Sequence, residues 1–266
     1  MATLVCFHAH PDDEAIATAG VMAAAAEQGH RVVLVVATGG EQGEVPDGFL
    51  GPGERLADRR RAETHASAAL LGVSRVEFLG YGDSGMVATP SNAAPDSFWQ
   101  ADVEEAAQRL ASILSEESAE VVTVYDDHGT YGHPDHVQVH RVGVRAAALA
   151  GTERIYEATV NRDAFRRLAA AYPALVEVLD ADAMDLGVAE ELLTTAVDVR
   201  PWLEAKRAAM RAHASQISEQ SFFLSLDDEV FAATFGTEWF IRRGTPVPVE
   251  ALETTLFEGP PPGGHS

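Results

Sequence analysis

The sequence predicts an α/β fold: a Rossmann-like, mostly parallel sheet with helices on both faces. Short, continuous apolar runs that suit buried strands alternate with longer amphipathic stretches that suit helices. Glycines follow two of the expected helices, as is common where a helix ends in a left-handed residue. The chain has 266 residues, 46% of them hydrophobic, which suits one large α/β domain.

The alternation is regular over the first 160 residues. The expected strands are 4–9, 31–37, 75–79, 120–125 and 155–160. The expected helices are 12–28, 54–71, 101–117 and 134–150, with Gly29 and Gly72 closing the first two. A loop rich in glycine, proline, serine and asparagine follows the third strand. Because helices separate the strands, the connections predict parallel pairing.

The pattern is less regular in the last third of the chain. We expect one domain, 1–266, with a core of about residues 1–160 and a C-terminal subregion of about 161–257. Helices are expected near 162–171, 189–193 and 200–217. This subregion should pack against the sheet and help to close the site. Residues 258–266 are rich in proline and glycine, which predicts a disordered tail, so His265 is a poor ligand candidate.

Composition narrows the possible partners. The net charge of −22 argues against nucleic acid and anionic membranes, because both would be repelled. No apolar run approaches the roughly 18 residues of a membrane span, and no signal peptide is evident. The single cysteine, Cys6, excludes an internal disulfide and is expected to be a small core residue. We expect a cytoplasmic protein, with the oligomeric state left open between a monomer and a homo-oligomer.

Two short motifs carry the functional prediction. One is the run 8–14, His-Ala-His-Pro-Asp-Asp-Glu, and the other is the run 131–136, Tyr-Gly-His-Pro-Asp-His. Each follows an expected strand and opens an expected helix, which places both at the edge where open α/β sheets bind ligands. Proline followed by acids could also be an ordinary helix start. That alternative does not explain a histidine before each proline, so the motifs favour a metal-dependent hydrolase.

The residues alone leave the ligand set partly open. His10 can point into the crevice, and one of Asp12 and Asp13 can bind a metal while the other faces the attacking water. His133 and His136 share one side of the first helical turn. His140 forms an i, i+4 pair with His136, although a structural role is favoured for it. His8 shares a face with His10 but lies deeper in the sheet, which favours a supporting role.

These motifs resemble those of the LmbE-like/PIG-L-like family of zinc-dependent N-deacetylases, which act on N-acetylglucosamine-containing molecules. The resemblance is strong over roughly the first 150 residues and continues through 60–63, 83–86 and 206–216. It is nearest to the actinobacterial mycothiol branch, which contains a deacetylase and a conjugate amidase. The family implies a Rossmann-like fold and hydrolysis of an acetamido sugar, with a small amino-sugar molecule as the partner.

The resemblance also implies residue roles. The metal ligands would be His10, Asp13 and His136, holding Zn²⁺, with Fe²⁺ or Co²⁺ also accepted by such a set. Asp12 would be the general base. His133 would be the acid or oxyanion stabiliser, oriented by Asp135 and kept protonated by Asp135 and Asp12. Tyr131 would contact the developing oxyanion, and Arg60 and Asp83 would bind the sugar.

Several alternatives stay open at this level. Arg60 could be a plain surface charge, and Asp83 could belong to an ordinary turn. Lys206 and His213 share a helix face and could both lie at the surface. The loop 40–53 could act as a lid over the site.

The alternative functions also belong to different classes. An amidase acting on mycothiol S-conjugates is the runner-up, although that branch often carries a lysine where this chain has residues 15–18, Ala-Ile-Ala-Thr. A metal-dependent phosphoesterase would need basic groups that are scarce near the motifs. A binding module without catalysis would have no need for Asp12 and His133.

Overall fold

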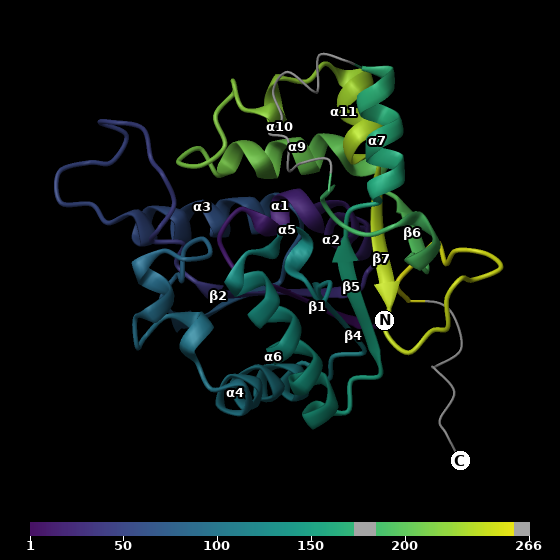
Figure 1. Cartoon of the computed structure of the whole chain (residues 1–266), viewed down its shortest axis with the longest axis horizontal. Coiled ribbons are helices and arrows are strands. Elements are labelled where there is room, and N and C mark those ends of the chain that lie inside the picture. The colour runs from purple at the N-terminus through teal and green to yellow at the C-terminus, as the bar shows by residue number, and fades with distance from the viewer. Residues whose placement is uncertain (173–184, 258–266) are drawn as a thin grey trace.

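The computed structural model describes residues 1–172 and 185–257, and it contains a seven-stranded sheet (Figure 1). The order is β3-β2-β1-β4-β5-β7-β6. The strands are β1 (Thr3–His8), β2 (Arg31–Thr38), β3 (Arg75–Tyr81), β4 (Val121–Tyr125), β5 (Arg154–Thr159), β6 (Thr195–Asp198) and β7 (Thr237–Arg242). The first five pair in parallel, and β7 pairs antiparallel with both β5 and β6. The predicted mostly parallel sheet is confirmed.

The central strands are continuous apolar runs because both faces of the sheet are covered. All residues of β1 and β4 are buried, as are seven of the eight in β2. Strand order reverses at β1, which lies between β2 and β4. Open α/β sheets bind ligands beyond the carboxyl ends of the strands at such a point.

Helices form one layer on each face of the sheet (Figure 1). One layer contains α4 (Val103–Glu116) and α6 (Pro134–Ala150), which pack on each other and on the central strands. A Cβ added at Gly143 of α6 would lie 2.3 Å from the Val124 side chain, so a glycine permits this close approach. On the other face α1 (Asp13–Ala17), α2 (Ala19–Glu27) and α3 (Leu56–Leu70) cover the sheet, and α9 (Leu203–Ala212) packs on their outer side (Figure 1).

The first expected helix is in fact two helices, broken at Thr18. The Thr18 hydroxyl hydrogen-bonds to His8 Nε2 at 2.8 Å. The Glu238 carboxylate of β7 accepts the backbone N–H groups of Gly20 and Val21, both at 2.8 Å, which caps the start of α2. Tertiary partners therefore take over the hydrogen bonds that a continuous helix would have used.

The C-terminal part differs most from the prediction. The helix at 162–171 is confirmed as α7 (Arg162–Ala171). The stretch 189–193 contains only the 3₁₀ turn η4 (Glu190–Leu192), and 200–217 contains a 3₁₀ turn, η5 (Arg200–Trp202), followed by α9. Strands β6 and β7 and the short helices α10 (Phe222–Ser225) and α11 (Asp228–Phe235) were not predicted. The expected disordered tail, 258–266 with His265, lies outside the described residues.

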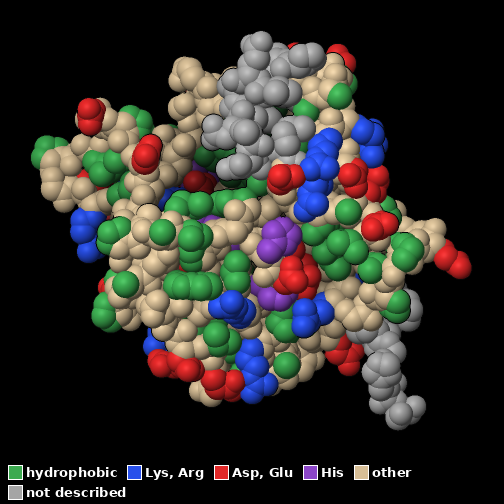
Figure 2. Space-filling model, viewed as in Figure 1, with side chains coloured by type: hydrophobic (Ala, Val, Ile, Leu, Met, Phe, Trp, Pro, Cys, Tyr) green, Lys and Arg blue, Asp and Glu red, His purple; other side chains and the backbone are tan. Residues whose placement is uncertain are grey.

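The remaining elements are the 3₁₀ turns η1 (Pro90–Ala93) and η2 (Phe98–Gln100) and the one-turn helix α5 (Gly129–Gly132). Within the described ranges, no helix is both long enough and apolar enough to cross a membrane. Acidic and basic side chains are interspersed on the viewed face, so the net charge is not gathered into one patch there (Figure 2).

Candidate metal centre and active site

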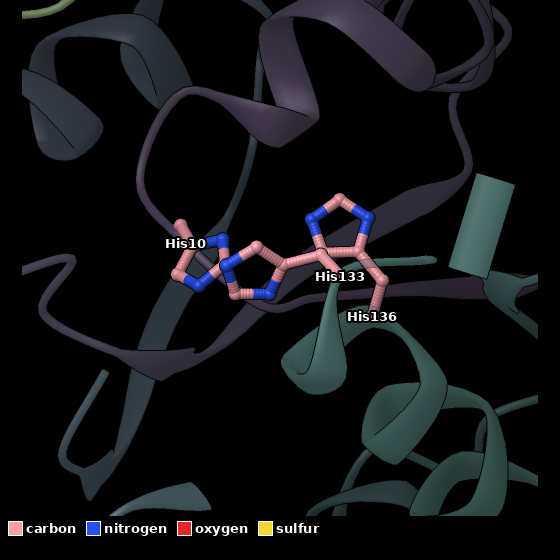
Figure 3. Close-up of side chains that lie close together, drawn as sticks. All are labelled: His10, His133 and His136. Atoms are coloured by element: carbon pink, nitrogen blue, oxygen red, sulfur yellow. The ribbon is translucent and has the colours of Figure 1, made fainter. Parts of the chain in front are cut away.

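The two histidine motifs meet at the carboxyl-terminal edge of the sheet. β1 and β4 are neighbouring parallel strands, so the chain leaves both on the same side. The rings of His10, His133 and His136 approach one another there, with centroids 4.6 to 5.5 Å apart (Figure 3). All three side chains are buried. The sequence therefore correctly predicted that these imidazoles converge.

Asp13 lies between two of these imidazoles. Its Oδ2 atom is 3.4 Å from His10 Nδ1 and 3.5 Å from His136 Nε2. Ligands about 2.0–2.2 Å from a tetrahedral metal lie about 3.4 Å apart, so these separations fit a divalent cation. The imidazoles and the carboxylate also supply the nitrogen and oxygen donors that such a cation takes.

Other donor combinations occur close by. His10, His133 and His136 have ring nitrogens within 4.8 Å of one another, and His10, Asp83 and Asp135 form a second such group. His10 belongs to both of these groups, and its Nε2 atom is 3.2 Å from Asp135 Oδ2 and 3.5 Å from Asp83 Oδ1. Although burial lowers the pKa of His10, these carboxylates and Asp13 raise it well above its ordinary value.

Asp12 is held in a backbone conformation that is rare for a residue with a side chain. Its φ is +97°, in the region that favours glycine. Its N–H donates to Glu14 Oε2 at 3.1 Å, and its Oδ1 is 3.1 Å from Arg60 Nη2. Burial raises the pKa of the Asp12 carboxyl to about 6, while the Arg60 charge opposes that rise. Backbone strain retained at such a position indicates a functional constraint.

His133 has a defined tautomer. Its Nδ1 atom accepts the backbone N–H of Asp135 at 3.1 Å, so a neutral ring carries its proton on Nε2. Burial, with the charges of His10 and His136, lowers the pKa of His133 to about 4. The ring is therefore placed to donate a hydrogen bond from Nε2 in its neutral form.

The contacts of Asp135 correct one expectation. Asp135 is expected to orient His133 and, with Asp12, to keep it protonated. The orienting bond comes from the Asp135 backbone, whereas the carboxylate faces His10 and the pKa of His133 is lowered. The Asp135 carboxylate also accepts the Ser84 N–H at 2.9 Å and the Ser84 hydroxyl. Only the backbone of Asp135 contacts the His133 ring. At the start of α6 the His133 ring nitrogen caps the helix by accepting the Asp135 N–H.

Tyr131 borders the cluster from the other side. Its hydroxyl is 3.4 Å from His136 Nε2, and the residue is 48% exposed, so it can reach both the cluster and solvent. Burial of its hydroxyl end raises the pKa of the phenol, which keeps it a hydrogen-bond donor near neutrality. The adjacent Thr130 has a φ of +65°, so the turn that presents Tyr131 is strained.

Arg60 and Asp83 border the polar pocket, a space of about 290 Å³ beside the cluster. Arg60 is only 4% exposed and donates to the carbonyls of Gly40, at 2.7 Å, and Pro11, so the surface-charge alternative is wrong. Asp83 accepts the N–H groups of Gly85 and Gln42 at 2.8 and 3.1 Å.

Gln42 and Gly43, from the loop 40–53, also line the polar pocket. The loop therefore borders the space beside the cluster. Whether it opens and closes as a lid stays a prediction.

Two further polar side chains that could have been at the surface are buried. Lys206 is 1% exposed and pairs with Glu238, with Nζ 2.6 Å from Oε1. His213 is fully buried, and its Nε2 is 2.5 Å from Glu14 Oε1. The surface alternative for both residues is therefore wrong.

Three other sequence candidates lie outside the histidine cluster. His8 hydrogen-bonds to the Tyr125 hydroxyl at 2.9 Å and to Thr18, and burial lowers its pKa to about 4. His140 hydrogen-bonds to the Tyr125 carbonyl oxygen at 3.0 Å. Burial raises the pKa of the Cys6 thiol to about 12, which fits a core residue and not a nucleophile.

Sequence reasoning missed three contributors to the site. Glu14 appeared only as a helix-start acid, but it contacts both Asp12 and His213. Ser84 belongs to a recognised segment but had no assigned role. Tyr125 ends an apolar strand, and its ring stacks on His136 at 4.0 Å between centroids. The only sequence signal for this stacking contact is the position of Tyr125 at the end of a strand that leads into the site.

The fold and site together define a Rossmann-like protein with a histidine and aspartate cluster able to hold a divalent metal. A family model described as GlcNAc-PI de-N-acetylase, PIG-L, matches residues 5–147. The chain is also 42% identical to the 1D-myo-inositol 2-acetamido-2-deoxy-alpha-D-glucopyranoside deacetylase of Acidothermus cellulolyticus, covering 97% of this chain and 94% of that protein. The chain belongs to the PIG-L family.

Two solved structures share the fold at low sequence identity. One is the N,N'-diacetylchitobiose deacetylase of Pyrococcus horikoshii, with a TM-score of 0.59 and 20% identity, covering 90% of this chain and 83% of that one. Another is GalB, the 4-carboxy-2-hydroxymuconate hydratase of Pseudomonas putida KT2440, with a TM-score of 0.59 and 18% identity, covering 95% and 100%. Because a hydratase has this architecture too, the fold alone does not identify the reaction.

Proposed function

We propose that this protein is a zinc-dependent N-deacetylase that releases acetate from an N-acetylglucosamine unit joined to inositol. The observation that carries the proposal is the placement of Asp13 between His10 and His136, with Asp12 directly beside them. The substrate is taken from the near full-length relatives, which are named as deacetylases of that glycoside.

In this proposal His10, Asp13 and His136 hold the cation. A divalent cation bound there would polarise the amide carbonyl and make water a better nucleophile. The set leaves room for Fe²⁺ or Co²⁺ as well as Zn²⁺. The metal identity is thus a proposal that measured metal content can decide.

Asp12 is the proposed general base. Its carboxylate takes a proton from the attacking water and returns it to the nitrogen as the C–N bond breaks. Arg60 fixes this carboxylate at 3.1 Å and can also reach sugar hydroxyls across the polar pocket. Asp83, on the wall of the same pocket, is the proposed acceptor for a second hydroxyl.

His133 and Tyr131 are the proposed oxyanion donors. The neutral His133 ring offers its Nε2–H, and Tyr131 offers its phenol. Both hydrogen bonds strengthen as negative charge develops on the carbonyl oxygen, which lowers the barrier. Asp135 contributes indirectly, through its backbone bond to His133 and its carboxylate beside His10.

The test measures two quantities for each variant: amine release from N-acetylglucosaminyl-inositol and bound zinc per chain. We expect Asp12→Ala to keep zinc but lose turnover by about 10²–10⁴-fold, the usual contribution of a positioned base. His136→Ala should lose the metal together with activity. Asp198→Ala, at a side chain that is 54% exposed on the outer strand β6, is the control and should change neither. Near-normal turnover by Asp12→Ala would make the base assignment wrong.

A further inference from the structure

A second, larger space adjoins the cluster of Asp13 and the three histidines. This cavity, which we call the apolar cavity, has a volume of about 460 Å³ and is bordered at one end by Asp13, His136 and Tyr131. Its other walls come from β5, β7, α7, α10 and α11. It is therefore built largely by the C-terminal part of the chain and opens directly at the cluster.

The wall of the apolar cavity is mostly hydrophobic. Phenylalanines from three helices line it, together with a leucine of α7 and a tryptophan of β7: Phe165, Phe222, Phe223, Phe235, Leu168 and Trp239. A lining of this kind selects for apolar ligand groups, because polar groups would lose water without gaining partners.

Several of the polar side chains in the wall have partners within the protein. Lys206 and Glu238 pair at 2.6 Å. The Thr159 hydroxyl donates to Asp126, and the Thr234 hydroxyl donates to a carbonyl of its own helix. These groups are occupied, so they do not make the cavity a polar site.

The polar pocket shares part of its wall with the apolar cavity. Asp13, Ile16 and Tyr131 border both spaces, whereas Arg60 and Asp83 border only the polar pocket. An amide with its sugar in the polar pocket would have its carbonyl at the cluster. The α-carbon of the acyl group is bonded directly to that carbonyl carbon, so the acyl chain starts at the mouth of the apolar cavity.

We propose that the apolar cavity is an acyl subsite that lets the protein hydrolyse glucosamine amides with unbranched acyl groups longer than acetyl. The proposal rests on the deacetylase function proposed above. In the reaction the amide C–N bond breaks, water supplies oxygen to the acyl carbon and a proton to the nitrogen, and a fatty carboxylate and free glucosamine leave. Each buried methylene can favour the longer amide by up to about fourfold.

The experiment measures kcat/KM for N-acetyl-, N-butanoyl- and N-hexanoylglucosamine by amine release. Calorimetry of the metal-free protein measures binding of the same three amides. We expect kcat/KM and affinity to rise from acetyl to hexanoyl, by about threefold or more. A glucosamine series with an octyl group at the anomeric carbon tests whether the cavity holds that substituent instead.

A cavity-filling variant locates the effect. Ala164 of α7 lines the cavity, and Ala164→Phe should lower hexanoyl kcat/KM and affinity at least tenfold while changing the acetyl values less than about twofold. Ala170→Phe, at an exposed position on the same helix, is the matched control and should leave both chain lengths unchanged.

The outcomes separate this proposal from the deacetylase function. Cleavage of the acetyl amide with tenfold poorer cleavage and binding of the hexanoyl amide would overturn the acyl subsite alone. An equal loss of kcat/KM for the acetyl and hexanoyl amides in Ala164→Phe would also overturn it. So would a loss in Ala164→Phe that is confined to the octyl glycosides. If no amide is hydrolysed but hexanoyl binding is tighter and is lost in Ala164→Phe, the subsite stands and the deacetylase function fails.

Discussion

At the scale of single residues, Glu14 connects the catalytic candidate Asp12 to the protein interior. Its carboxylate is fully buried and accepts the Asp12 N–H at 3.1 Å, the Ser67 hydroxyl at 2.6 Å and His213 Nε2 at 2.5 Å. Burial opposes the charged form of His213, but Glu14 raises its pKa above the ordinary value. His213, which directly follows α9, thus fixes the carboxylate that holds Asp12 in its strained conformation.

We predict that His213→Phe lowers kcat about 10- to 100-fold with KM changed less than twofold, because a small displacement of Asp12 weakens catalysis more than binding. Bound metal per chain should stay at the wild-type level. Steady-state kinetics and metal analysis check this. His65→Phe, the same exchange at an exposed histidine of α3, is the control. A parallel loss of metal, or a rise of KM alone, would show that His213 does not act through Asp12.

The residues of the site differ in how far sequence could predict them. His10, Asp13, His133 and His136 stand in motifs at strand ends, so their convergence follows from topology. The direction of the Asp135 side chain does not follow from topology, because its partners His10 and Ser84 come from distant segments that motif spacing does not specify.

Ion pairs also link elements of the fold, at the edge of the sheet opposite the site. Glu117, directly after α4, meets Arg31 at the start of β2 and Arg75 at the start of β3. Hydrogen bonding by Arg31, followed by Arg75, lowers the pKa of Glu117 to about 2, and its side chain is only 8% exposed. The folded state therefore binds a proton at Glu117 less readily than the unfolded chain does.

This pKa shift predicts a pH-dependent contribution to stability. A depressed pKa stabilises the fold above the ordinary value of 4.5, and the stabilisation is lost as the pH falls toward 2. We expect Glu117→Gln to lower the free energy of unfolding by about 1 kcal/mol at pH 7 and by less at pH 3. Urea unfolding at both pH values measures it. Glu116→Gln, at a side chain 61% exposed, should have a smaller effect, and an equal effect at pH 3 and 7 would contradict the assignment.

Elements were predictable where local pattern and tertiary context agree. The central strands β1, β2 and β4 are largely apolar, buried runs, and the helices α3, α4 and α6 begin and end close to their predicted bounds. The helix break at Thr18 could not be predicted, because its causes are His8 and Glu238, the second more than 200 residues away. β6 and β7 escaped prediction for a related reason: β7 alternates between buried and half-buried residues, unlike the apolar central strands.

At the scale of the whole molecule, the C-terminal part extends the sheet and also walls the site. β7 hydrogen-bonds to β5, and α9 packs on α1, α2 and α3. The expectation that this part would help to close the site has support from the apolar cavity, whose wall includes α7, α10 and α11. Its strand content was not visible in sequence because strand pairing at a sheet edge is a long-range property.

The ion pair between Lys206 and Glu238 joins these parts of the molecule. Lys206 lies on α9, Glu238 lies on β7, and Glu238 also accepts two N–H groups of α2. Both charged side chains are nearly inaccessible to water, with 1% and 3% exposure. Removing the Lys206 charge would leave the Glu238 carboxylate buried without its cationic partner, which costs more than the pair itself contributes.

We therefore predict that Lys206→Met destabilises the protein by about 3–5 kcal/mol, because the buried Glu238 carboxylate then lacks its cationic partner. The double variant Lys206→Met with Glu238→Gln should recover part of this loss, since a neutral amide can still accept an α2 N–H group. Denaturant unfolding measures both. Arg211→Met, on the same helix but half exposed and paired with Glu219, should change stability by less than about 0.5 kcal/mol. If Lys206→Met cost no more than Arg211→Met, the pair would not join the C-terminal part to the core.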